Sequence, residues 1–585
     1  MKLLIAFVLA GLAVVSAQVP VCPDCVEARY WQVDPGYWNA AAPDLNSFPE
    51  RQLDEPLHGT DLGIAFSGGG TRSAAASLGQ LRGLVQNNWL PHVRYMTAVS
   101  GGSWAAVPFT YFDGEEMSEL LGSFEANPKV IDAQLFRSTP NGRLARQITR
   151  SRLAATGAAE SLQFLPDRAR EADLKEIRDQ AILVRDLVRK LRGRNLPDST
   201  RQNKTYAHLL GQIFIDPLVK DGNRKPYSWT RTTAIDLTDA SRQPQMGFQQ
   251  VPPSRPFLIV GGTIIWNREG FVYPRLIPVE YTPLYTGVRQ QFGNLGGTYV
   301  TPWAYDRERA TVVGDRLLVD KATLRMFTLA DVIASSGAAP QLQLMLGSDL
   351  PPRVRAAMAQ AAGAFPAFRP FAIRDGKEVA PSGEIAHGDG GFTDNLGLMP
   401  LLARRVKHII AFVNSNKPYT ANEQLQSYFF PLAVQNGSGD KTMNAVFPKG
   451  KYRELLDGLD RVTKDGGPAV FCDTMSVSKN ELYNIAAYDG LKLCWVYNFA
   501  ASKWRADLPD ALQHWLDPDP KKGGLKDLRH FPYYATFEEN RPYVIKLNAL
   551  QVNLLANLSA WSISTDTGRT RIREHFGDGV LPAPR

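Results

Sequence analysis

Residues 95–104, YMTAVSGGSW, constrain the fold of this chain more than any other stretch. The pattern of residues 95–99 predicts a short, half-buried strand. Ser100 and two glycines follow, and a run of small residues then predicts the start of a helix. This is the layout of a nucleophile elbow, in which a tight turn holds a hydroxyl clear of the sheet beside the N–H dipoles of the helix. Ala98 replaces the first glycine of the usual G-x-S-x-G pattern, and Ser-Gly-Gly also occurs in ordinary turns, so the stretch alone leaves both readings open.

Two further stretches carry groups that a serine nucleophile needs. Residues 62–66 (LGIAF) predict an apolar strand, which is followed by three consecutive glycines at 68–70 and by Arg72. Consecutive glycines expose backbone N–H groups in a curved loop, so this loop is predicted to form a nest able to hold an oxyanion. Far downstream, Asp389 lies between two glycines and is expected in a tight turn with little side-chain cover.

A glycine loop, an elbow serine and a glycine-flanked aspartate, in this order, resemble the patatin-like, cytosolic phospholipase A2 and phospholipase B (lysophospholipase) superfamily of lipid acyl hydrolases. The resemblance implies that Ser100 is the nucleophile and Asp389 its base, in a catalytic dyad without histidine. Arg72 matches the arginine of the S-G-G-G-x-R pattern in the phospholipase A2 branch, where it faces the substrate phosphate. The implied oxyanion donors are Gly68, Gly69 and Gly70.

The resemblance also implies an α/β fold, a three-layer patatin-like sandwich with a mainly parallel central sheet, a nucleophile elbow and helical, cap-like insertions. The order of strand, glycine loop, helix, strand, serine turn and helix supports this interpretation, because a βαβα unit implies parallel strands joined by a right-handed crossover. The predicted organisation is a signal peptide at 1–17, an N-terminal lead-in at 18–60, a catalytic domain at 61–565 with a helical insertion at about 113–250 and a loop-rich excursion at about 415–540, and a tail at 566–585.

Two predicted helices have a functional and a structural interpretation. The charged amphipathic helix expected over residues 168–194 is either a cap or a membrane-touching surface over the site, or an ordinary surface helix packed on the core. Residues 327–340, FTLADVIASSGAAP, predict a helix that ends in small residues. These residues either leave a groove for substrate or allow the helix to pack closely.

The N-terminus predicts export. Residues 1–17, MKLLIAFVLAGLAVVSA, have one lysine, an apolar core and small residues before Gln18, as in a secretory signal peptide. A transmembrane anchor is the alternative, but the apolar run over residues 3–15 is shorter than the roughly 20 residues that a span needs. We therefore expect an extracellular or periplasmic protein.

Composition and charge exclude some function classes. Hydrophobic residues make up 44% of the chain and charged residues 21%, which is ordinary for a globular protein. The formal net charge of +8 mildly favours anionic surfaces. No concentrated Lys/Arg tract appears, so nucleic acid is not an expected partner.

The chain has four cysteines, at positions 22, 25, 472 and 494. An even number in an exported chain predicts disulfides, and we expect Cys472 to pair with Cys494. The spacing of Cys22 and Cys25 is also that of a redox C-x-x-C motif or half a zinc site. Neither alternative has its usual sequence context, so structural disulfides are the preferred interpretation.

Competing chemistries lack their motifs. A Ser-His-Asp triad would need a histidine after the acid, or His387 beside it, and His514, His530 and His575 occur late enough. None of the four has a motif-like context, so each is interpreted as structural. Thr71 and Arg72 follow the glycines where a P-loop has Lys and Ser/Thr, and Ser73 occupies the third glycine position of a dinucleotide-binding pattern. No metal or other cofactor is predicted.

The sequence therefore predicts a secreted phospholipase A/B or lysophospholipase. Its expected partners are a phospholipid or lysophospholipid substrate and, peripherally, membranes or micelles; the sequence predicts no oligomeric state. A carboxylesterase or acyltransferase with the same dyad is the alternative enzyme. A catalytically dead lipid-binding homologue is the alternative from another class, and Ala98 is the one departure that favours it.

Overall fold

The computed structural model describes residues 22, 24–114, 116–124, 127–150, 205–229, 247–267, 274–308, 310–345, 359, 362–370, 372–379, 383–431, 444–534 and 547–582. The predicted signal peptide and the helix predicted over residues 168–194 lie outside these residues. No helix within the described ranges combines the length and the apolar character needed to cross a membrane.

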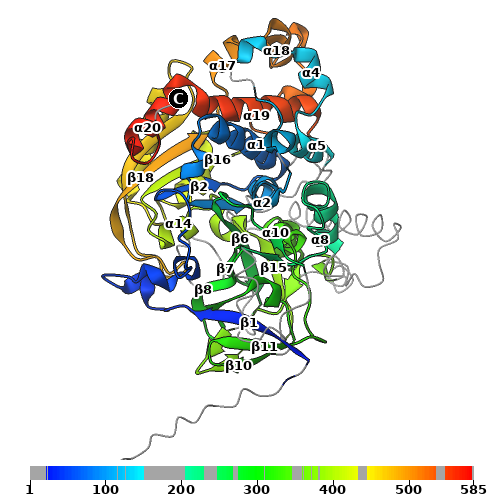
Figure 1. Ribbon diagram of the computed structural model, residues 1–585. Coiled ribbons are helices and arrows are strands. Elements are labelled where there is room, and N and C mark those ends of the chain that lie inside the picture. The colour runs from blue at the N-terminus through cyan, green and yellow to red at the C-terminus, as the bar shows by residue number, and fades with distance from the viewer. Residues whose placement is uncertain are drawn as a thin grey trace, which may run out of the picture.

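A 14-stranded mixed sheet organises the molecule (Figure 1). Its centre consists of five parallel strands, in the order β6 (Phe257–Trp266), β3 (Tyr95–Val99), β2 (Leu62–Phe66), β16 (His408–Val413) and β18 (Tyr488–Tyr497). Antiparallel strands extend it beyond β6, in the order β7 (Arg275–Tyr281), β8 (Thr286–Phe292), β9 (Leu295–Val300), β1 (Cys25–Gln32), β11 (Arg316–Asp320) and β10 (Ala310–Val313). The predicted parallel arrangement of the strands before the glycine loop and before Ser100 is confirmed.

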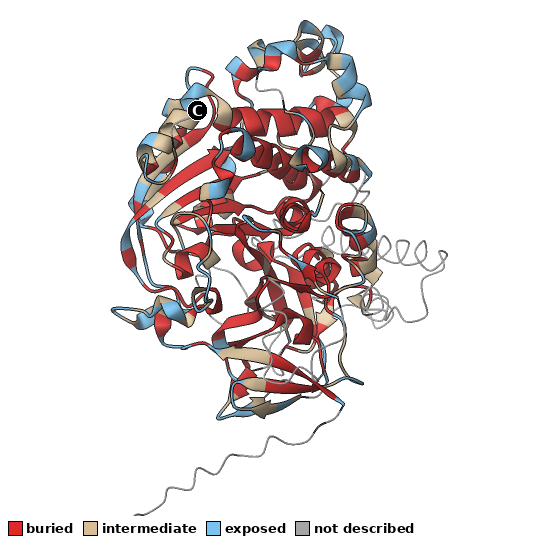
Figure 2. Cartoon of the chain, viewed as in Figure 1, coloured by how far each residue is buried: buried red, intermediate tan, exposed pale blue. Residues whose placement is uncertain are grey.

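Successive side chains of a central strand point to opposite faces of the sheet, so each strand packs against a layer on either side. Ile64 and Phe66 of β2 face the core that contains α1 (Gly70–Gln86), whereas Ala65 between them faces the opposite core. That second core includes Leu401 of the helix α14 (Met399–Ala403). A parallel strand covered on both faces has to be apolar throughout, as β2 is, and Figure 2 shows that the centre of the molecule is almost entirely buried.

Small residues let α1 pack against the C-terminal helix α19 (Ala549–Ser564) (Figure 1). A Cβ built at Gly79 would lie 2.0 Å from the carbonyl oxygen of Ala556, and one built at Gly83 would lie 2.7 Å from the side chain of Ile563. The backbones touch at these positions, so larger residues would separate the helices.

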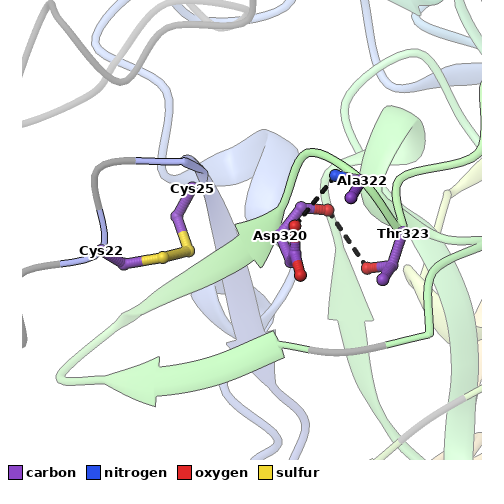
Figure 3. The surroundings of a disulfide bond; sticks show 5 residues. All are labelled: Cys22, Cys25, Asp320, Ala322 and Thr323. Atoms are coloured by element: carbon purple, nitrogen blue, oxygen red, sulfur yellow. Dashed lines mark hydrogen bonds between the residues drawn. A yellow bond between two sulfur atoms is a disulfide. The ribbon is translucent and has the colours of Figure 1, made fainter.

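The predicted lead-in at 18–60 contributes a strand to the sheet. Strand β1 pairs with β11 on one side and with β9 on the other. Figure 3 shows the disulfide between Cys22 and Cys25 at the start of β1, where Cys25 pairs with Asp320 at the end of β11. The predicted pairing of Cys472 with Cys494 is confirmed, so all four cysteines form disulfides.

Two predictions for the C-terminal third were wrong in part. The region expected to be loop-rich contains the helix α16 (Lys449–Thr463) and the strands β17 (Val470–Val477) and β18, which pair across the second disulfide. The expected tail contains the helix α20 (Asp566–Phe576), which packs on β17. Strand β17 lies at the sheet edge, and its buried and exposed residues do not alternate regularly, so its sequence pattern was weak.

Candidate active site

Ser100 occupies the tight turn that the sequence predicts. It follows β3 directly, has a φ of 49°, and begins a short 3-10 turn that leads into the helix α2 (Ser103–Tyr111). A Cβ built at Gly101 would lie 1.9 Å from the Gly70 carbonyl oxygen, and one built at Gly102 would lie 2.8 Å from that of Phe66. Both positions therefore require glycine, because the elbow packs against the glycine loop.

The alanine that departs from the elbow pattern does not disturb the turn. Ala98 lies inside β3, fully buried, between Phe66 of β2 and Val260 of β6 in the sheet register. Its methyl group belongs to the core that contains α1. The departure is therefore accommodated without changing the conformation of Ser100.

Asp389 meets Ser100 although 289 positions separate them in the chain. It is the last residue of strand β15 (Ile385–Asp389), which pairs with the far half of β6. The Ser100 hydroxyl donates a hydrogen bond to Asp389 Oδ2 over 2.8 Å, and the Gly391 N–H donates to Oδ1 over 2.8 Å. Thr263 of β6 donates to the Asp389 carbonyl oxygen over 2.8 Å and fixes its backbone. The hydrogen bond predicted between the two side chains is present.

Burial controls the charge of this aspartate. Asp389 is 1% exposed. Desolvation raises its pKa from 3.8 to about 7, and the hydrogen bonds from Gly391 and Ser100 lower it by less. A carboxyl group with a pKa near neutrality is a stronger base than an exposed aspartate and is still partly ionised at pH 7.

The glycine loop lies against the serine, but its three N–H groups are not equivalent. Gly68 is packed closely, since a Cβ there would lie 3.2 Å from Ser100 Cβ, and its N–H donates to the Asn395 carbonyl oxygen over 2.8 Å. That donor is already used, which corrects the prediction of three oxyanion donors. Gly69 and Gly70 have φ values of 137° and 56°, and α1 begins at Gly70. The first N–H groups of a helix have no acceptor within the helix, so these two remain the candidate donors.

Arg72 is more enclosed than a surface phosphate ligand would be. Its side chain is 1% exposed, Nε donates to the Asn414 carbonyl oxygen over 3.1 Å, and Nη1 donates to the Tyr534 carbonyl oxygen over 2.5 Å. A Cβ built at Gly69 would lie 2.7 Å from Nη2. Arg72 thus ties the glycine loop to two other segments, and its predicted contact with a substrate phosphate stays a prediction.

No histidine among the described residues hydrogen-bonds to Ser100. His387 lies two residues before Asp389, but its ring nitrogens are 2.9 Å from the Tyr305 hydroxyl and 2.9 Å from the Ile385 carbonyl oxygen. Burial lowers its pKa to about 4, so the ring is neutral at pH 7. His575 contacts the Asp473 carbonyl oxygen. The geometry therefore favours a Ser-Asp pair over a triad.

The sequence did not reveal two polar residues that support the site. Ser336, at the end of the helix α10 (Leu329–Ser336), accepts a hydrogen bond from the Ser100 N–H over 2.8 Å. Asn414, after β16, donates its backbone N–H to Ser67 over 2.8 Å and its side-chain amide to Ser73 over 3.1 Å, on either side of the glycine loop. The only signal for Ser336 was the small-residue end of its helix, which also packs closely, because a Cβ at Gly337 would lie 2.9 Å from Trp104 Nε1.

Comparisons with known proteins place this site in a family. Residues 64–402, more than half of the chain, match the patatin-like phospholipase family. A phospholipase B from Cryptococcus neoformans var. grubii is 33% identical over 81 residues, which is 12% of this chain and 13% of that protein. Mouse cytosolic phospholipase A2 epsilon is 38% identical over 85 residues, which is 14% of this chain and 10% of that protein. The matches thus span about a tenth of these relatives' lengths.

Among solved structures, human GIVD cytosolic phospholipase A2 aligns with 90% of this chain and 62% of its own chain, with a TM-score of 0.40 and 15% sequence identity. The family match covers the glycine loop, the elbow serine and the aspartate turn together. The chain therefore belongs to the patatin-like phospholipase family.

Proposed function

We propose that this protein is a lipid acyl hydrolase of the phospholipase A/B or lysophospholipase type, which cleaves carboxylic esters through an acyl-serine intermediate. The observation that carries the proposal is the 2.8 Å hydrogen bond from Ser100 Oγ to Asp389. It joins a hydroxyl on a tight turn to a buried carboxylate that can accept its proton. Membership of the family supports a lipid ester as the substrate class.

In the first half of the proposed reaction, Ser100 Oγ attacks the ester carbonyl carbon while its proton moves to Asp389. The negative charge that develops on the carbonyl oxygen is stabilised by the N–H groups of Gly69 and Gly70, and the loss of one such donor typically costs about 10²–10³ in rate. When the intermediate collapses, the bond to the alcohol oxygen breaks. Asp389 returns the proton to the departing alcohol, and the acyl group remains on Ser100.

In the second half, water replaces the alcohol. The water oxygen attacks the acyl carbon while Asp389 accepts a proton from the water. When the bond between the acyl carbon and Ser100 Oγ breaks, this proton moves to Ser100 Oγ. The raised pKa of Asp389 favours both directions of transfer, because the carboxyl group holds a proton briefly near neutral pH and releases it again.

Hydrolysis of a lipid panel tests the proposal. The purified protein is assayed with a phospholipid, a lysophospholipid and a neutral short-chain ester, and Ser100→Ala serves as the control. We expect fatty acid release from the phospholipid or the lysophospholipid by the natural protein and none by the variant. Cleavage of the short-chain ester alone would favour the carboxylesterase alternative, and no cleavage of any substrate would favour a lipid-binding homologue.

A second arm tests the predicted role of Arg72. Arg72→Lys keeps the charge but loses the planar fork of the guanidinium group. If Arg72 faces the substrate phosphate, phospholipid hydrolysis falls far more than hydrolysis of the neutral ester. Equal losses would assign Arg72 only to the carbonyl contacts that it makes with Asn414 and Tyr534.

Peripheral membrane contact is proposed through the segment that contains the short helix α4 (Ala133–Ser138). Val130 and Leu135 are 64% and 56% exposed, more than the other exposed large hydrophobic residues of the described chain. Beside them Lys129 forms an ion pair with Asp507 over 3.3 Å, whereas Arg137 is exposed and packs over the Trp515 ring, so its positive charge suits an anionic lipid surface. We expect that Val130→Asp with Leu135→Asp weakens sedimentation with anionic vesicles and leaves cleavage of a soluble ester unchanged, whereas Val85→Asp, at a residue 41% exposed, changes neither.

Export remains part of the proposal, and it rests on the apolar segment at residues 1–17. N-terminal sequencing of the protein recovered from outside the producing cell is expected to begin at Gln18. Recovery of the chain inside the cell with its first residues intact would contradict export.

A further inference from the structure

We infer that Ser336 is a positioning residue, which holds Ser100 and the Asp389 turn in register for the proton transfer between them. This inference rests on the proposed function. Ser336 ends α10, more than 230 residues after Ser100 and more than 50 before Asp389.

Three hydrogen bonds join Ser336 to three segments of the site. Its hydroxyl accepts from the backbone N–H of Ser100 over 2.8 Å and donates to the carbonyl oxygen of Gly261 in β6 over 2.6 Å. Its carbonyl oxygen accepts from the backbone N–H of Gly390, next to Asp389, over 3.0 Å. One residue thus contacts the turn of the nucleophile, the turn of the base and β6, the strand that pairs with both catalytic segments.

The donor and acceptor sites of a hydroxyl group explain why a serine is required. A hydroxyl has one donor and two acceptor sites, and here it satisfies a buried N–H and a buried C=O at once. Alanine would leave both groups without this partner in a buried site. The Ser100 peptide would then lose the acceptor that holds it in a conformation with φ of 49°, which is uncommon for residues other than glycine.

The effect on chemistry follows from the distance between Ser100 and Asp389. A misplacement of about 1 Å in a catalytic group can cost about 10²-fold in rate. The hydrogen bond from Ser100 also lowers the pKa of Asp389. A looser contact therefore raises that pKa, and the acidic limb of the pH–rate profile moves to higher pH.

The test compares two adjacent serines of the same helix. Ser336→Ala is expected to lower kcat for a soluble ester by about 10²-fold, with little change in KM, and to shift the midpoint of the kcat–pH profile upward. Ser335→Ala is the matched control, because Ser335 is equally buried but its hydroxyl donates to the Asp331 carbonyl oxygen within α10. It should keep both the rate and the midpoint.

Two further variants keep the inference testable if Ser336→Ala does not fold. Ser336→Cys nearly preserves the size but offers only a weak donor and acceptor, so we expect the same upward shift with a smaller loss of rate. Ser336→Thr retains the hydroxyl, so the midpoint of its kcat–pH profile should lie closer to that of the natural protein than the midpoint of Ser336→Cys does. Thermal unfolding of each variant identifies those that fold.

The outcomes separate this inference from the proposed function. If folded Ser336→Ala and Ser336→Cys match Ser335→Ala in kcat and in midpoint, Ser336 is merely structural and the inference fails. If the natural protein hydrolyses no ester, the proposed function itself fails. Activity that disappears in Ser100→Ala but persists unchanged in the Ser336 variants leaves the proposed function intact and overturns only the role of Ser336.

Discussion

At the residue scale, the burial of Asp389 conflicts with its role as a base. A general base has to ionise, yet the side chain is buried and its hydrogen-bond partners are a hydroxyl and a backbone N–H. Neither partner carries a positive charge, so desolvation dominates and the pKa rises to about 7. This arrangement makes both the activity and the stability of the protein sensitive to pH.

Activity is expected to rise with pH through a midpoint near 7. Only the ionised form of Asp389 accepts the serine proton, and its pKa is about 7. His387 adds no titration there, because its pKa lies at about 4. The measurement is kcat/KM for a soluble ester from pH 5 to pH 9. A flat profile, or a midpoint near 4, would contradict a base whose pKa is raised to about 7.

Asp389→Asn is expected to remove activity but to increase stability above neutral pH. The pKa of Asp389 is raised on folding, so the folded state binds more protons than the unfolded state between about pH 4 and pH 7, and the natural protein loses stability as pH rises through that window. The loss approaches about 4 kcal/mol. In urea unfolding, the free energy of unfolding of the variant should therefore exceed that of the natural protein at pH 8 and nearly equal it at pH 4. Equal stabilities at pH 8 would contradict the buried charge.

The sequence revealed those residues of the site that a tight turn requires. Ser100 and Asp389 were predictable because glycines surround them, and a glycine-rich turn leaves a short polar side chain exposed to a partner. Ser336, which acts mainly through its hydroxyl, and Asn395, which acts through its carbonyl oxygen, were not predictable, because only the fold brings them close to the site. For the same reason the sequence did not show that the Gly68 N–H is already used.

At the scale of elements, the contact between α1 and α19 positions the glycine loop, because α1 begins at that loop. The two helices are separated by more than 460 residues, and backbone contact at Gly79 sets their distance. Helix α1 was predictable from its apolar periodicity, but its pairing with α19 was not, since a helical pattern does not specify which partner buries it. The strands β17 and β18, which are 8 and 10 residues long, were missed because their buried and exposed residues do not alternate regularly.

Gly79→Val is expected to destabilise the protein by at least about 1–3 kcal/mol, because overpacking a closed contact forces the backbones apart. A Cβ at this position would lie only 2.0 Å from the Ala556 carbonyl oxygen. Gly450→Ala in α16 is the control, since a Cβ there meets no atom within 4 Å, and alanine favours a helix over glycine by up to about 1 kcal/mol. Denaturant unfolding measures both, and an unchanged midpoint in Gly79→Val would contradict the close contact.

At the scale of the whole molecule, a buried charge cluster joins segments from three parts of the chain. Arg404, after α14, donates to Glu50 of the N-terminal segment over 2.7 Å and to Glu280 of β7 over 2.8 Å. Tyr285 donates to Glu50 over 2.9 Å, and Tyr299 donates to Glu280 over 3.2 Å. The cluster fixes the N-terminal segment against the layer behind the active site.

Arg404→Met is expected to destabilise the whole fold by about 3–5 kcal/mol, because it leaves two buried carboxylates without their cation. The neighbouring Arg405 is partly exposed and contacts the Tyr488 ring at 5.2 Å. Arg405→Met should therefore cost far less, which makes it the matched control. Similar losses of unfolding free energy in the two variants would show that the buried cluster contributes nothing beyond an ordinary surface arginine.

Trapping of the acyl-enzyme tests whether Ser100 is the nucleophile of a Ser-Asp pair. The protein is mixed with an activated ester, quenched in acid during turnover and digested, and the acylated peptide is identified by mass spectrometry. We expect an acyl group on Ser100 in the natural protein, much slower acylation in Asp389→Asn, and neither acylation nor turnover in Ser100→Ala. An acyl group on another residue, or a Ser100→Ala variant that hydrolyses the ester at the natural rate, would contradict this role of Ser100.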